Sequence, residues 1–177
     1  ALNKLLGLDE DARPELSERP AYSKLDVQSL ETEINRVLDN NPSLWLAEQS
    51  VKQAKLQLEL FDWSTGSSNQ YEAEKIDVNK AQLSADSAKE QMRLAVRNIY
   101  NNIMKLEEGY AAQQEALKQA EDTLKVKKLM YEVGLSTKTD LQSAELAVTK
   151  AQNDLQSLVY QHESLKLAFQ KPWAMGN

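Results

Sequence analysis

The longest regular feature of the chain is a seven-residue repeat of apolar side chains between residues 72 and 133. Its main seam is formed by Val96, Ile103, Tyr110, Leu117, Leu124 and Tyr131, with Met92, Ile99, Leu106 and Ala120 between them. This spacing predicts one helix of about 60 residues, roughly 90 Å long at about 1.5 Å per residue. Because such a helix is not stable alone in water, it must pack against other helices.

Shorter repeats on either side of this segment predict its packing partners. The first comprises Leu44, Ala47, Val51, Ala54, Leu58 and Phe61. It predicts a helix over 42–61, with Asn41 as its cap and Pro42 in the first turn. The second comprises Leu141, Ala144, Val148, Ala151, Leu155, Leu158, His162, Leu165 and Phe169, and it predicts a helix over 137–170. A short helix is expected over 27–39, with Asp26 as its cap and Leu25 packing on Leu30 as a staple.

The connections between the predicted helices are short. Gly134 supplies a residue for the left-handed conformation that ends a helix, and Thr137 with Asp140 forms a capping-box pattern for the next one. The other connection is the polar loop around Gly66. Since short connections make consecutive helices antiparallel neighbours, we expect two shorter helices stacked end to end along the long one.

The predicted fold is therefore all-α, a long antiparallel coiled-coil hairpin with a short N-terminal helix. Residues 25–171 are expected to form a single elongated domain. Residues 1–24, which hold two prolines and no sustained period, are interpreted as a lead-in or linker that lies over something else. Residues 172–177 are interpreted as a tail.

A second seven-residue repeat runs beside the main seam of the long helix and consists of small or short side chains. Its members are Ala81, Ala88, Ala95, Asn102, Gly109, Ala116 and Thr123. Small side chains allow another backbone to approach closely, so this small-residue stripe predicts a neighbour on a second side of the helix. We interpret it as a surface for self-association between copies of the chain.

Composition and charge exclude several classes of function. The net charge of −6 at pH 7 argues against nucleic-acid binding, which needs clustered Lys and Arg. The sequence has no run of about 18 apolar residues, so we expect no helix that spans a bilayer. It has no cysteine, which excludes disulfides and thiolate metal sites.

Candidate chemistry is equally sparse. His162 is the single histidine and has no Cys or carboxylate pattern around it, so we interpret it as packed or bonded to a partner rather than as a metal ligand or base. Glu107 and Glu108 are interpreted as a solvated acidic run. Because the sequence has no phosphate loop, nucleophile motif or catalytic carboxylate pair, we expect no enzyme, cofactor or metal.

Three motifs resemble one half of a TolC-type outer membrane efflux protein, whose chain contains two such repeats. The main motif is Tyr131-x-x-Gly134-x-x-x-x-x-Asp140-Leu141-x-x-Ala144, followed by Leu155 and Leu158. Further matches are Asn41-Pro42-x-Leu44-x-x-Ala47 and Leu2-Asn3-x-Leu5-Leu6-Gly7, the latter similar to the end of a preceding repeat. The resemblance covers nearly the whole chain.

The resemblance implies a component of an efflux or type I secretion complex, located in the cell envelope and facing the periplasm. Family members are trimers with a hollow helical duct, and a single repeat would need more copies to close a ring. The implied partners are a periplasmic adaptor protein and an inner-membrane transporter. The strands that family members insert between the second and third helices are missing at Gly66, so the chain is either an excised half or a strandless relative.

The resemblance also assigns roles to the hairpin tip. Gly134, Leu135, Ser136, Thr137 and Lys138 would meet the adaptor, while Tyr131 and Asp140 would belong to a gate. A purely structural turn, with Asp140 as a helix cap and Tyr131 as a seam residue, explains the same residues.

Two other functions are compatible with long helices. A stand-alone coiled-coil interaction or spacer module would need no transport role. A lipid-binding amphipathic helix is disfavoured, because the predicted polar faces are acidic and poor in Lys and Arg.

Overall fold

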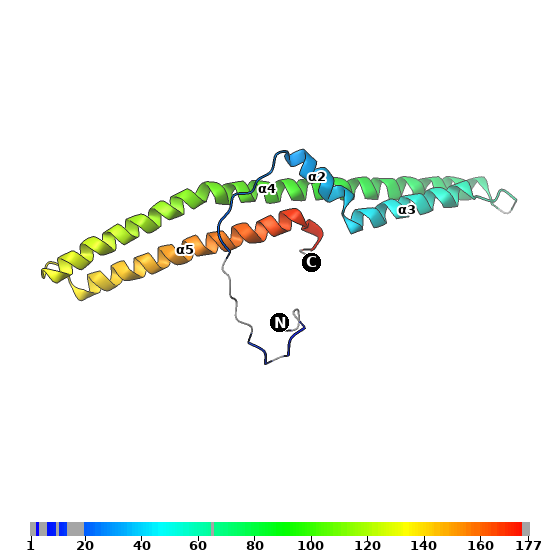
Figure 1. The fold of residues 1–177 in the computed structure, drawn as a ribbon. Coiled ribbons are helices and arrows are strands. Elements are labelled where there is room, and N and C mark those ends of the chain that lie inside the picture. The colour runs from blue at the N-terminus through cyan, green and yellow to red at the C-terminus, as the bar shows by residue number, and fades with distance from the viewer. Residues whose placement is uncertain (1–2, 4–6, 10, 14–19, 65, 175–177) are drawn as a thin grey trace.

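The computed structural model describes the chain apart from residues 1–2, 4–6, 10, 14–19, 65 and 175–177, and it shows an elongated rod (Figure 1). The elements in chain order are α2 (Leu30–Asp39), α3 (Pro42–Glu59), α4 (Ser68–Glu132), α5 (Lys138–Gln170) and the 3₁₀ helix η1 (Pro172–Ala174). The described residues contain no strand, which agrees with the predicted all-α class. Helix α4 runs the length of the rod, with α3 along its first part and α5 along its second (Figure 1).

Polar side chains fix the starts of α3 and α4. The Asn41 side chain accepts hydrogen bonds from the backbone N–H groups of Ser43 and Leu44, at 2.9 and 3.3 Å, as an N-cap should. Ser67 and Gln70 form a capping box at the start of α4. Helix α4 therefore begins at Ser68 rather than at the predicted residue 72, while α3 ends at Glu59 rather than at 61.

The start of α2 differs from the prediction. The helix begins at Leu30 and is capped by Ser29, so both the predicted start at residue 27 and the predicted cap Asp26 are wrong. The segment before Ser29 is held on the helices by tertiary contacts, among them the hydrogen bond that the Leu25 backbone N–H donates to a Glu107 side-chain oxygen of α4 at 2.6 Å. Leu25 and Val27 pack against the core from this non-helical segment, which leaves Ser29 as the first residue able to cap a helix.

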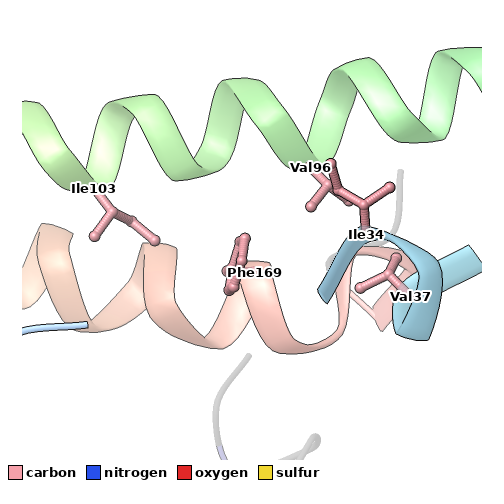
Figure 2. Packing of buried hydrophobic residues seen from close by; sticks show 5 residues of the cluster. All are labelled: Ile34, Val37, Val96, Ile103 and Phe169. Atoms are coloured by element: carbon pink, nitrogen blue, oxygen red, sulfur yellow. The ribbon is translucent and has the colours of Figure 1, made fainter. Parts of the chain in front are cut away.

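The core lies at the middle of the rod, where α2, α4 and α5 meet (Figure 2). Its five buried members are Ile34 and Val37 of α2, Val96 and Ile103 of α4, and Phe169 of α5. Trp173 of η1 also packs against this cluster. The first three residues of the predicted tail, 172–174, form η1, and its last three lie outside the described part of the chain.

Candidate interaction surfaces of the rod

The hairpin tip between α4 and α5 is a closed, hydrogen-bonded turn. Gly134 has a φ of 77°, the left-handed conformation in which residues with a Cβ are strained. Its N–H donates to the Tyr131 carbonyl at 3.0 Å, and the Leu135 N–H donates to the Met130 carbonyl at 2.8 Å. This pair of bonds is the Schellman motif, and it confirms that Gly134 terminates the long helix.

Asp140 closes the other side of the tip. Its Oδ2 accepts hydrogen bonds from the Thr137 N–H at 3.0 Å, the Thr137 hydroxyl at 2.8 Å and the Ser136 hydroxyl at 3.3 Å. These bonds, the Thr137 backbone bond first, lower the pKa of Asp140 below its usual range. The carboxylate is thus a cap for α5, which is the structural alternative to a role in a gate.

Apolar side chains surround this polar turn. Leu135 is 78% exposed and Val133 is 69% exposed. Tyr131, the other proposed gate residue, is also exposed, as are Thr137 and Lys138. The tip therefore combines a hydrogen-bonded backbone with accessible apolar side chains.

The small-residue stripe is only partly accessible. Ala95, Asn102, Ala116 and Thr123 are exposed, whereas Ala81, Ala88 and Gly109 are half-buried. A Cβ added to Gly109 would lie 3.7 Å from Leu158 of α5, so this position packs within the same chain. The four exposed members are the part of the stripe that the chain does not cover itself.

Large apolar residues also line faces that the chain does not cover itself. On α5, Leu146, Tyr160 and Leu167 are separated by multiples of seven residues and are exposed. Each follows a seam residue by two positions, which places it about 200° around the helix from the seam. Further exposed apolar residues are Leu46, Leu56 and Leu60 on the α3 side and Ile76, Leu83 and Leu94 on α4.

A cluster that the sequence did not predict holds the segment 20–27 across the middle of the rod; we call this segment the strap (Figure 1). The Tyr22 ring stacks on Tyr110 of α4, with ring centroids 3.6 Å apart and planes 8° from parallel. Lys166 of α5 donates to the Ser23 carbonyl and hydroxyl at 3.1 and 2.7 Å. Burial raises the pKa of the Tyr22 phenol, and the Glu107 carboxylate raises it further.

Glu107 and His162 lie beneath the strap. The His162 ring is fully buried, and its Nε2 lies 3.1 Å from the Glu107 oxygen that also accepts the Leu25 N–H. Because a carboxylate only accepts, Nε2 carries the proton. The interpretation of His162 as a packed, partner-bonded histidine is confirmed, but that of Glu107 as solvated is wrong. One sequence feature pointed to this buried pair: the polar residue His162 occupies a position in an otherwise apolar seam.

The described part of the chain shows neither a metal site nor a membrane-spanning helix. Among those residues, no group of three or more His, Cys, Asp or Glu side chains could hold a metal ion. None of the helices described there is both long and apolar enough to cross a membrane. What the described residues do form is an extended all-helical rod with apolar residues exposed at its tip and on its outer faces.

Comparison with known proteins gives the family. A family model described as outer membrane efflux protein matches residues 47–168, more than half of the chain. The chain belongs to the outer membrane efflux protein family, which confirms the resemblance noted in its sequence. No curated protein and no solved structure matches. Members of this family are parts of efflux channels associated with the outer membrane and periplasm, not enzymes.

Proposed function

We propose that copies of this chain pack side by side as a duct or scaffold segment of an efflux or secretion complex. The hairpin tip contacts a periplasmic adaptor, and the complex includes an inner-membrane transporter. Family membership supports the transport role. Self-association and adaptor contact are inferred from the apolar residues exposed on the surface of the rod.

The observation that carries the proposal is the amount of surface left uncovered. The chain of 20.0 kDa exposes 13209 Å², whereas a compact monomer of that mass exposes about 8,700 Å². The exposed apolar residues recur at helical spacing on all three long helices, as expected for seams that neighbouring helices fill. A stand-alone spacer would have no need for such repeated apolar faces.

The proposed lateral contact is tested by measuring the assembly state in solution. The variant Leu146→Glu places a charge on the exposed face of α5, and we expect a lower mass in sedimentation equilibrium than for the wild type. Gln161→Glu adds the same charge at an exposed polar position and should leave the mass unchanged. A wild-type chain that is monomeric at high concentration would refute lateral packing.

The proposed adaptor contact is tested separately by capture on an immobilised periplasmic adaptor. Leu135→Asp should reduce capture at least tenfold, because Leu135 is 78% exposed at the tip. Leu146→Glu leaves the tip intact and tests whether capture also depends on assembly. Unchanged capture of Leu135→Asp would rule out the tip as the adaptor contact.

A further inference from the structure

The buried histidine beneath the strap has an incomplete set of hydrogen bonds. The Nε2 atom of His162 donates to Glu107, but its Nδ1 is also buried and has no hydrogen-bond partner among the described residues. A carboxylate oxygen of Glu163 lies 3.6 Å from Nδ1. In the neutral ring this contact brings together two groups that can only accept. A second proton, placed on Nδ1, would turn it into a charge-assisted interaction.

Charged side chains of both helices face this ring. Glu107 on α4 and Glu163 on α5 are mostly buried, and Glu163 pairs with Lys166 at 2.9 Å. With a neutral imidazole the group carries two negative charges and one positive charge, whereas with an imidazolium the charges balance. Unbalanced charge is costly where water is excluded. Because the strap covers this group, a docked strap favours the protonated ring.

The strap adds an aromatic ring to the same group. The ring centroids of Tyr22 and His162 are 5.1 Å apart, within the distance of about 6 Å over which a cation is attracted to an aromatic ring. Burial raises the pKa of the Tyr22 phenol, so this group stays neutral near pH 7, and Tyr110 stacks on its ring. The charged residues of the strap itself, Lys24 and Asp26, are exposed. An imidazolium therefore gains a contact that exists only while the strap is docked.

We propose that His162 makes the strap a pH-sensitive latch, in which a second proton on Nδ1 holds the strap on α4 and α5 and its loss loosens the strap. Because the docked strap binds this proton more tightly than the open strap, the proton favours docking by the same factor. The extra stabilisation is therefore present at acid pH. It is lost as the pH rises through the range in which histidine ordinarily titrates, about pH 6 to 7.

The latch operates within one chain. All its contacts join the strap to α4 and α5 of the same copy, so it needs neither lateral packing nor an adaptor. It controls whether residues 20–27 cover the middle of the rod or leave it. The latch can therefore fail while the proposed function holds, and the reverse is also true.

The test is amide hydrogen exchange of Leu25 in the full chain, read by NMR. The Leu25 N–H is bonded to Glu107 only while the strap is docked, so its protection factor reports strap opening after correction for the intrinsic effect of pH on exchange. In the wild type this factor should be about fivefold higher, or more, at about pH 5.5 than at about pH 8, the change that one net hydrogen bond gives. A factor that is equal at the two pH values, or higher at pH 8, would overturn the proposal.

Two variants separate the proton from other effects of pH. In Glu163→Gln the side-chain amide can donate to the neutral Nδ1, and in His162→Gln the ring that binds the proton is gone while a donor to Glu107 remains. In both, the protection factors at the two pH values should agree within about twofold. Glu145→Gln, which changes an exposed carboxylate of α5, is the matched control and should keep the wild-type change. Glu163→Gln behaving like this control would also overturn the proposal.

A second measurement follows the proton itself. His162 is the single histidine of the chain, so the imidazole ¹⁵N signals report its protonation directly. Tyr22→Ala loosens the strap and removes the aromatic contact, so the ratio of imidazolium to neutral ring at about pH 6.5 should fall about two- to fivefold. Tyr131→Ala, which removes an exposed tyrosine at the hairpin tip, should leave the ratio unchanged. An unchanged or higher ratio in Tyr22→Ala would show that docking does not favour the proton.

Discussion

Glu107 offers a direct test of how the strap is held on the rod. Its Oε1 accepts the Leu25 N–H at 2.6 Å and lies 3.1 Å from Nε2 of the buried His162. The variant Glu107→Ala removes the acceptor for both donors. We expect the strap to leave α4 and α5 more often.

The size of the increase in strap opening depends on which hydrogen bonds are lost when the strap leaves the helices. The Leu25 N–H bond is lost whenever the strap leaves, and a hydrogen bond to a charged group contributes about 1.5–3 kcal/mol. Removing it should raise the population of the open strap about 10- to 150-fold. In Glu107→Gln an amide oxygen can still accept, so the bond weakens by about 1 kcal/mol and opening should rise roughly fivefold.

The assay is trypsin cleavage after Lys24, which lies within the strap. When opening is fast compared with cleavage, the cleavage rate follows the open population. Mass spectrometry of the time course gives the rate, and Glu108→Ala, which removes an exposed carboxylate next to Glu107, is the control. If Glu107→Ala is cleaved no faster than Glu108→Ala, the reasoning about the strap is wrong.

The remaining predictions concern the core, a helix cap and the tip. Phe169→Ala empties a fully packed position and should lower the free energy of unfolding by about 3–5 kcal/mol in urea denaturation. Asn41→Ala removes the N-cap of α3 and should lower it by about 1–2 kcal/mol. Because the folded-state pKa of Asp140 is lowered, its stabilisation is present above about pH 4 and is lost as the pH falls through the lowered pKa. The difference between wild type and Asp140→Asn should shrink accordingly in urea titrations from about pH 6 to pH 2.

Each of these three has an outcome that contradicts it. A loss for Phe169→Ala no larger than for the exposed neighbour Gln170→Ala would show that the central cluster does not hold the rod together. An Asn41→Ala variant as stable as the wild type would mean that other groups cap α3. A difference between wild type and Asp140→Asn that stays constant with pH would show that the carboxylate does not stabilise the tip through its charge.

The seven-residue apolar repeat predicted most of the fold, because the same spacing of apolar residues recurs many times along each long helix. The hairpin at Gly134 and the caps Asn41 and Thr137 follow from residues adjacent in sequence. Their side chains act within three or four positions, so the sequence was sufficient. Where a boundary depends on a polar cap outside the apolar repeat, as at Ser67, the predicted helix begins too late.

The contacts of the strap could not be predicted in the same way. Tyr22 and Tyr110 are far apart in the chain, and no periodic pattern links them. Local propensity favoured a helix that started at residue 27, but Leu25 and Val27 pack against the core from a non-helical segment, and the Leu25 N–H donates to Glu107. The same contact explains why Glu107 is 13% exposed at its side chain, although it stands in an acidic run.

Buried residues are unevenly distributed along the rod. The five-residue core lies at the centre, while the arms contribute only scattered buried residues: Leu44, Val51, Ala85 and Ala144. An arm of two helices with one narrow seam gains little from packing, and helices in water need tertiary contacts to persist. The apolar residues that could supply those contacts are present but lie on the outer faces. Side-by-side packing would therefore stabilise mainly the arms, so amide hydrogen exchange in α3 and the tip-proximal part of α5 should slow more on assembly than exchange around Ile103.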